Sequence, residues 1–257
     1  MSVVKTFGKY RYLMVELVKK DIKLKYRNSY LGVVWTMLEP LLTMVVLTLV
    51  FSSFLGKGTK DFPVYILTGR LLYSFFSNAT KAALKSVRSN ASMIKKVYVP
   101  KYMYPFSSVL SGYVIFLISL IVLAVVSMAR GIYPTMRLLW MVVPLLQILL
   151  LTVGVGMILA TLAVFFRDVE YLWGVALMLI MYASGIFYRV EDVLSTKNAW
   201  IFKLNPLYAV IVNFRNAVFG QPMDFQAMWY AFGVGAMSLL IGVFVFYKKQ
   251  DKFILYL

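Results

Sequence analysis

The sequence predicts an all-α membrane protein in which six transmembrane helices form one domain, residues 1–257. Of the 257 residues, 61% are hydrophobic, whereas soluble domains are roughly 45–50% apolar. The apolar residues also gather in runs able to cross a hydrocarbon core of ~30 Å at ~1.5 Å per helical residue. The six predicted spans are residues 31–55, 62–79, 106–128, 138–166, 172–188 and 225–247.

The distribution of positive charge predicts how these spans are oriented. With the N-terminus in the cytoplasm, the inner segments carry 18 of the 27 Lys and Arg residues and the outer segments carry 8. The remaining one is Arg70, inside the second span. Because basic residues are enriched in cytoplasmic loops, we expect both termini in the cytoplasm. Membrane orientation therefore explains the net charge of +17, and we expect no nucleic-acid partner.

The absence of two residue types limits the chemistry. The chain has no cysteine and no histidine, which removes thiol nucleophiles, disulfides, the commonest metal ligand and the usual general base. The segment GKGTK at 56–60 has the wrong spacing for a GxxxxGK[ST] phosphate loop. We expect no catalytic residue, metal or cofactor in this chain, so any ATP and Mg²⁺ would bind to a partner subunit.

Residues 6–28 are predicted to form an amphipathic helix at the membrane interface, before the first span. Basic residues fall at helical spacing on one face, and apolar residues cover the rest. Such helices are drawn to anionic lipid headgroups. The alternative is a solvated basic face that binds no ligand.

Two charged residues, Glu39 and Arg70, lie inside predicted spans. Glu39 is about 12 Å from the inner side of the membrane and Arg70 about 18 Å, at ~1.5 Å per residue. A charge at this depth costs at least ~2.5–3.5 kcal/mol and needs a partner or water. We therefore predict an ion pair between Glu39 and Arg70, within or between subunits. The alternative is that each faces a separate wet path.

The segments between the spans differ in character. Residues 77–104 are strongly basic and contain no acid, which predicts a long cytoplasmic elbow between the second and third spans. In the fourth span, Gly154 and Gly156 permit close contact with other helices. Residues 189–224 are too polar and broken to span simply. We expect one or two short re-entrant helices there, at the outer membrane face before the sixth span.

Four local sequences follow one another along this topology. They are YRNSYLGVVWTMLEPLL (26–42), NASMIKKVYVPKYMYP (90–105), FFRDVEYLWG (165–174) and NPLYAVIVNFRNAVFG (205–220). Together they resemble the permease subunits of ABC-2 type polysaccharide exporters, which move O-antigen, capsule or teichoic acid chains. The resemblance covers residues 10–250. It implies a homodimer of permeases with two ATP-binding cassette subunits, in the bacterial cytoplasmic membrane.

The resemblance also implies a coupling helix in the region 85–104, which would seat on the ATP-binding subunit. The residues expected to make this contact are Arg88, Asn90, Met93, Ile94, Lys95, Lys96 and Val99. The alternative is an ordinary basic loop on the cytoplasmic side. The family more often has neutral residues where this chain has Glu39 and Arg70.

A lipid-linked glycan would need an export path. Aromatic rings offer flat apolar faces, and Tyr and Trp add a polar handle. The expected path residues are Tyr30, Trp35, Phe51, Tyr182, Phe187 and Tyr188. The alternative for each is simple anchoring at the membrane interface, where Tyr and Trp are enriched.

An anionic lipid headgroup would need cations at the inner face. Lys23, Lys25 and Arg27 stand where the interface helix meets the first span, and we expect them to receive the headgroup. The alternative is general attraction to anionic membrane lipids. Arg167 and Asp168 are expected to brace an inner gate or to touch the ATP-binding subunit. The alternative is helix capping by Asp168.

These features predict a permease subunit, without an ATPase site of its own, of an ATP-driven exporter of lipid-linked polysaccharide or teichoic acid. One alternative is an ion-coupled secondary transporter with Glu39 as its proton site, although such transporters commonly show inverted repeats. Another is a membrane glycosyltransferase or acyltransferase, which would need a general base and usually paired carboxylates or a metal.

Overall fold

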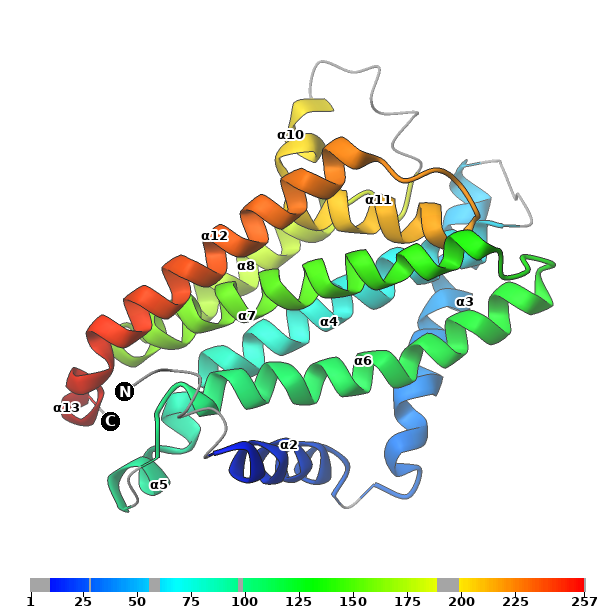
Figure 1. Cartoon of the computed structure of the whole chain (residues 1–257). Coiled ribbons are helices and arrows are strands. Elements are labelled where there is room, and N and C mark those ends of the chain that lie inside the picture. Colours follow the sequence, from blue (N-terminus) through cyan, green and yellow to red (C-terminus); the bar gives the residue numbers. More distant parts are fainter. Residues whose placement is uncertain (1–9, 28, 56–60, 97–98, 189–198, 257) are drawn as a thin grey trace.

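The computed structural model describes residues 10–27, 29–55, 61–96, 99–188 and 199–256, and all regular structure within these ranges is helical (Figure 1). The all-α prediction is therefore confirmed for this part of the chain. The α-helices and the 3-10 helices (η) are α2 (Arg11–Tyr26), η1 (Gly32–Val34), α3 (Trp35–Leu55), α4 (Phe62–Ser89), α5 (Ala91–Lys96), α6 (Met103–Ala129), η2 (Met136–Met141), α7 (Val142–Phe165), α8 (Val169–Tyr182), α10 (Ala199–Leu204), α11 (Pro206–Val218), α12 (Phe225–Lys249), η3 (Gln250–Lys252) and α13 (Phe253–Tyr256).

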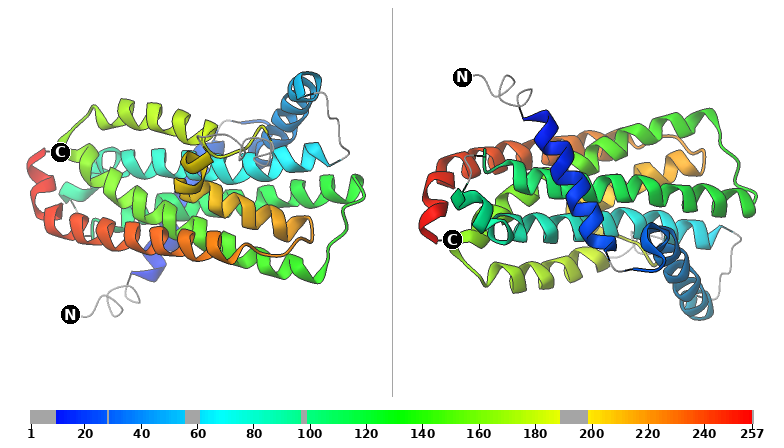
Figure 2. Two further views of the ribbon diagram at one scale, coloured as in Figure 1. Left: turned by 90° about the horizontal axis from the view of Figure 1, so that it is seen from above. Right: turned by 90° about the horizontal axis from the view of Figure 1, so that it is seen from below.

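Four long helices form the body of the molecule. α6, α4, α7 and α12 lie side by side in that order, α8 packs against α4 and α7, and α11 packs against α12, α4 and α7 (Figures 1 and 2). α3 stands steeply to this layer and contacts α4 and α6, while α2 runs beneath α6. α5 and α13 lie at one end of the bundle, and the turn between α6 and α7 lies at the other (Figure 1).

Four helical stretches are long and apolar enough to cross a membrane: Gly32–Phe51, Met103–Ala129, Met136–Phe165 and Phe225–Tyr256. They correspond to the predicted first, third, fourth and sixth spans. The other two predicted spans correspond to α4 and α8. The second half of α4 is polar and basic, and the 14 residues of α8 cover only about 21 Å of a ~30 Å core.

The elbow begins later than the sequence predicted. α4 continues to Ser89 instead of ending at residue 79, and the short helix α5 follows. The extension is amphipathic: Ala83 and Val87 are buried, whereas Lys85 is exposed. Because the segment has no proline or glycine, nothing in it ends the helix. Basic residues that looked like a loop therefore form the exposed face of α4.

Other boundaries also shift. α8 was expected at 172–188 but begins at Val169 and ends at Tyr182. The chain then turns at Gly185, whose φ of 58° is readily adopted by glycine. α10 and α11 lie in the region where one or two short helices were expected before the sixth span, and residues 189–198 lie outside the described ranges.

Two glycines bring α7 close to both of its neighbours. A Cβ added at Gly154 would lie 2.4 Å from the backbone nitrogen of Leu239 in α12, and one at Gly156 would lie 3.0 Å from the Cβ of Ala83 in α4. From the α12 side, a Cβ at Gly242 would lie 2.6 Å from the Gly154 carbonyl oxygen. The predicted close contacts of Gly154 and Gly156 are confirmed.

Candidate functional site

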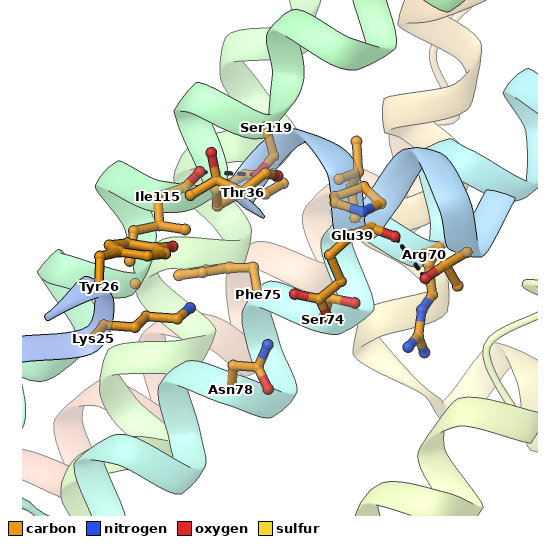
Figure 3. Close-up of a pocket in the computed structure, with 15 residues that line it drawn as sticks. Lys25, Tyr26, Thr36, Glu39, Arg70, Ser74, Phe75, Asn78, Ile115 and Ser119 are labelled. Atoms are coloured by element: carbon orange, nitrogen blue, oxygen red, sulfur yellow. Dashed lines mark hydrogen bonds between the residues drawn. The ribbon is translucent and has the colours of Figure 1, made fainter. Parts of the chain in front are cut away.

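α2, α3, α4 and α6 together line a polar crevice. Its larger part has a volume of about 690 Å³, and a smaller part of about 70 Å³ continues to Arg70 (Figure 3). The larger part is lined by Asp21, Ser86, Ser89, Asn90, Ser108 and Ser111, among others. The two parts share Lys25, Glu39, Asn78, Gly112 and Ile115. We call these two parts together the polar crevice.

The polar crevice follows from a polar stripe on α4. Arg70, Ser74 and Asn78 are four residues apart, and Ser86 and Asn90 continue the series at multiples of four. Successive members of such a series are neighbours on the helix surface. Because each step of four residues advances by about 40° at 3.6 residues per turn, the stripe winds gradually around α4. The remaining faces of α4 bury apolar side chains in the core. One helix therefore joins an apolar body to a polar lining.

Glu39 and Arg70 both line the smaller part of the crevice, but they do not form a direct ion pair in the single chain. Arg70 contacts the sulfur of Met181 at 4.0 Å, and its guanidinium carbon lies 5.9 Å from the Tyr73 ring centroid. Among the described residues, the ion pairs within 4.0 Å are Lys19–Glu16 and Lys85–Glu170. A pair between Glu39 of one subunit and Arg70 of another stays a prediction.

Carboxylates and cations face the crevice together. Asp21 accepts a hydrogen bond from the Ser108 hydroxyl at 3.3 Å, and partial burial raises the pKa of its carboxyl above the ordinary value of 3.8. Lys25 and Glu39 extend toward the crevice from α2 and α3 (Figure 3). Within the described ranges, no three Asp or Glu side chains group as a metal ion would require.

The three predicted headgroup residues separate in the structure. Lys25 lines both parts of the crevice, and its Nζ lies 5.6 Å from the Tyr26 ring centroid. Lys23 and Arg27 are exposed and line neither part. The last turn of α2 and the residue after it therefore place one cation within the crevice and two exposed cations outside it.

Four of the six predicted path residues gather near the ends of α3 and α8. The ring of Phe187 stacks on Phe51 at 5.0 Å between centroids and lies 6.4 Å from the Tyr182 ring. The Tyr188 hydroxyl donates to the Tyr182 carbonyl. We call Phe51, Tyr182, Phe187 and Tyr188 the aromatic cluster.

The other two predicted path residues lie apart from the aromatic cluster. Tyr30 precedes α3, Trp35 begins it, and both are exposed. They stand at the end of α3 opposite to Phe51. The structure thus divides the predicted aromatic lining into a packed group and two exposed rings.

Arg215 of α11 holds the turn that carries the aromatic cluster, although it was not among the predicted site residues. It is only 5% exposed. Its guanidinium donates to the carbonyls of Gly185 at 2.9 Å and Tyr65 at 3.1 Å. The guanidinium carbon also lies 3.5 Å from the centroid of the Tyr65 ring, a cation–π arrangement. The sequence signal was a single cation within a mainly apolar helix.

The predicted coupling residues of α5 and the chain just after it do not all face outward. Met93 is 41% exposed, and Lys95 and Lys96 are exposed. Ile94 is only 8% exposed, and Val99 packs against the hydrophobic core. Ile94 and Val99 therefore hold this segment to the body. Met93, Lys95 and Lys96 form the surface available to a partner, which we call the elbow surface.

Arg88 and Asn90 fasten the end of α4 to other helices. Arg88 donates to the carbonyl of Ala163 in α7 at 3.3 Å. The Asn90 side chain donates to the Ser86 carbonyl at 2.8 Å and accepts from Lys20 of α2 at 3.1 Å. These contacts within the chain position α5 relative to α2 and α7.

The turn between α7 and α8 lies beside the end of α4. Arg167 and Asp168 are exposed there. Asp168 precedes α8, but its side chain makes no capping hydrogen bond, so the capping alternative gains no support. Glu170 pairs with Lys85 of α4. Sequence reasoning missed this pair because nothing in the linear spacing of the two residues connects them.

The chain is similar to known membrane proteins over nearly its whole length. A family model described as ABC-2 type transporter matches residues 12–219. The chain is 28% identical over 243 residues to the O-antigen export system permease protein RfbA of Klebsiella pneumoniae, covering 94% of this chain and 93% of that protein. RfbA of Myxococcus xanthus is 26% identical over 98% of both chains. The capsule polysaccharide export inner-membrane protein CtrC of Neisseria meningitidis serogroup A is 21% identical over 89% of this chain and 88% of that protein. Because the family model covers most of its length, this chain belongs to the ABC-2 type transporter family.

Proposed function

We propose that this chain is the permease subunit of an ATP-driven exporter that moves a lipid-linked cell-surface polysaccharide across the bacterial cytoplasmic membrane. One observation carries the proposal: nearly the whole chain is similar to proteins named as O-antigen and capsule polysaccharide export permeases. Because those names cover more than one glycan, the proposal names a class of substrate, cell-surface polysaccharide, and no individual glycan.

In this proposal α4 and α8 complete a set of six spans, with both termini in the cytoplasm. The 28 residues of α4 cover about 42 Å, more than the ~30 Å of a hydrocarbon core. α8 is short, but the turn that follows it extends to Tyr188 and packs on the end of α3 through Phe187. The whole chain then forms a single transmembrane domain.

The active unit in this proposal is a homodimer with two ATP-binding cassette subunits. α3 and α8 support a dimer because both present apolar faces that the rest of the chain leaves exposed. These faces contain Leu42, Val46 and Leu49 of α3, and Leu172, Val175 and Leu179 of α8. A second copy packed on them would replace lipid contacts by close helix–helix packing, which favours association in a membrane.

Energy would reach the permease from the ATP-binding subunits through the elbow surface. The chain has no phosphate loop of its own. Nucleotide binding to the partner can shift the helices only if the partner binds their two arrangements with different affinity. Arg88, Asn90 and the Lys85–Glu170 pair tie this end of α4 to α2, α7 and α8, so displacement of α5 would be passed to those helices.

The test is co-purification with a candidate ATP-binding cassette subunit from the same cell, together with measurement of glycan at the cell surface. We expect Met93→Asp to lower both complex recovery and surface glycan by at least about tenfold, because a charge in the contact costs more than ~1.4 kcal/mol. Met136→Asp, at an exposed site of η2 at the other end of the bundle, is the matched control. Ile94→Asp is unsuitable, because Ile94 is buried within the chain itself.

Two outcomes would count against this proposal. If the Met93→Asp variant binds the ATP-binding subunit as well as the parent chain does, the elbow surface is not the docking site. Glycolipid movement by the purified chain without ATP would favour the ion-coupled transporter. Glu39→Gln should then abolish transport, whereas an ATP-driven exporter should retain ATP dependence in that variant.

A further inference from the structure

The polar crevice occupies a place where a membrane protein is normally apolar. Two of its walls, α3 and α6, belong to helices that are long and apolar enough to cross a membrane. Between them, α4 presents Arg70, Ser74 and Asn78. In hydrocarbon, a polar group without a hydrogen-bond partner costs several kcal/mol. This stripe therefore requires water or a polar ligand.

The crevice has the size and position of a ligand site. Its larger part, about 690 Å³, falls within the ~300–1,000 Å³ of typical small-molecule sites. It begins at Asp21 and Lys25 of the interface helix and continues inward to Arg70. A molecule entering from the inner membrane surface would meet it first along α2.

The lining offers hydrogen-bond donors and acceptors side by side. Asn78 does both, Lys25 donates, and Glu39 accepts when ionised. Each sugar hydroxyl likewise donates and accepts.

The charges of the crevice favour an uncharged ligand. The lining contains two acidic residues, Asp21 and Glu39, and two basic residues, Lys25 and Arg70. It therefore has little net charge. A lining in which carboxylates and cations balance offers a phosphate little net attraction. The exposed cations outside the crevice, Lys23 of α2 and Arg27 just after it, suit a phosphate better.

We infer that the polar crevice binds uncharged sugar residues of the glycan, those next to the lipid-linked phosphate. This inference rests on the proposed export function and adds a subsite within each subunit. The phosphate stays outside with Lys23 and Arg27, while the first sugars enter between α2, α3, α4 and α6. The crevice thereby selects for a glycan chain and not for a bare lipid phosphate.

The absence of native cysteine allows a direct test, because a single introduced cysteine reports without background. Asn78→Cys, in the assembled permease–ATPase complex in a lipid bilayer, is reacted with a membrane-impermeant, sulfonated thiol reagent. The controls are Ala83→Cys, buried on another face of α4, and Val125→Cys, exposed on the apolar surface of α6. The probes are the cell's own surface glycan, released from its lipid by mild acid, and inorganic pyrophosphate.

We expect Asn78→Cys to react at least about tenfold faster than either control, because a thiolate forms readily only in a polar environment. The released glycan should slow that reaction severalfold, and pyrophosphate should leave it unchanged. Ile115→Cys reports on the same crevice from α6 and replaces Asn78→Cys should the latter fail to assemble.

Three results would overturn the inference. An unreactive cysteine would mean that the crevice is closed and dry. Reaction that the glycan does not slow would mean that it holds water alone. Protection by pyrophosphate instead of glycan would mean a phosphate site. Export by the unmodified chain, measured in the same cells, separates the two proposals. Normal export with no protection of the cysteine by glycan refutes only the sugar subsite. Absence of export refutes the proposed exporter.

Discussion

At the scale of single residues, Arg215 shows how strongly a role depends on neighbours distant in sequence. The guanidinium fits because Gly69 has no side chain: a Cβ there would lie 2.8 Å from an Arg215 nitrogen. Its hydrogen bonds reach α4 at Tyr65 and the turn at Gly185. One side chain thus joins α11, α4 and the segment that carries Phe187 and Tyr188.

Replacing Arg215 by lysine should destabilise the protein although the charge is kept. Lysine cannot reproduce the planar group that donates to Gly185 and Tyr65 while lying over a ring. Hydrogen bonds to charged groups are worth about 1.5–3 kcal/mol, so we expect a loss of at least that size. Thermal unfolding in detergent measures it, with Arg130→Lys at an exposed position as control. Equal melting temperatures for the two variants would contradict the assigned role.

At the scale of elements, the packing of α7 against α12 is the closest helix contact described above. Gly154 and Gly242 lie opposite one another, and an added Cβ at either would approach a backbone atom within 2.6 Å. In a membrane, helix association depends on such close packing, because the lipid is as apolar as the side chains. The pair therefore holds the last long helix to the body.

Gly154→Ala should lower stability, whereas Gly233→Ala in α12 should not. The first substitution would push the backbones of α7 and α12 apart, and overpacking costs typically 1–3 kcal/mol. An added Cβ at Gly233 meets nothing within 4 Å, and alanine favours helix by up to about 1 kcal/mol. Thermal unfolding of both variants gives the comparison. A Gly154→Ala variant as stable as the parent chain would show that the two helices separate without cost.

At the scale of the whole molecule, α4 connects the two ends of the permease. Its C-terminal end contacts Glu170 and Ala163, and its N-terminal end holds Arg215 through Tyr65. Between these points it carries the polar stripe of the crevice. A displacement at the elbow surface would therefore reach the crevice and the turn of the aromatic cluster through one continuous helix.

The proposed homodimer leads to a cross-linking prediction. Val46 of α3 is 58% exposed, and Leu240 of α12 is 71% exposed on a helix that packs on α7 and not beside α3. We expect Val46→Cys to form a disulfide-linked dimer in native membranes under mild oxidation, and Leu240→Cys to stay monomeric. Dimers formed through Leu240→Cys alone would place the interface on the opposite side of the subunit.

The sequence by itself determined the helical membrane fold, the positions of four apolar spans, the pair of short helices before the last span and the close contacts of Gly154 and Gly156. These features depend on hydropathy, helical period and the absence of a side chain, which are local properties. Tertiary structure decided which side chains meet. Met93 and Ile94 are adjacent in sequence, yet only Ile94 is buried, and Arg215 finds partners on two other elements. The physical reason is that helical spacing tells which residues share a face, whereas the neighbour opposite that face is set by packing of the whole chain.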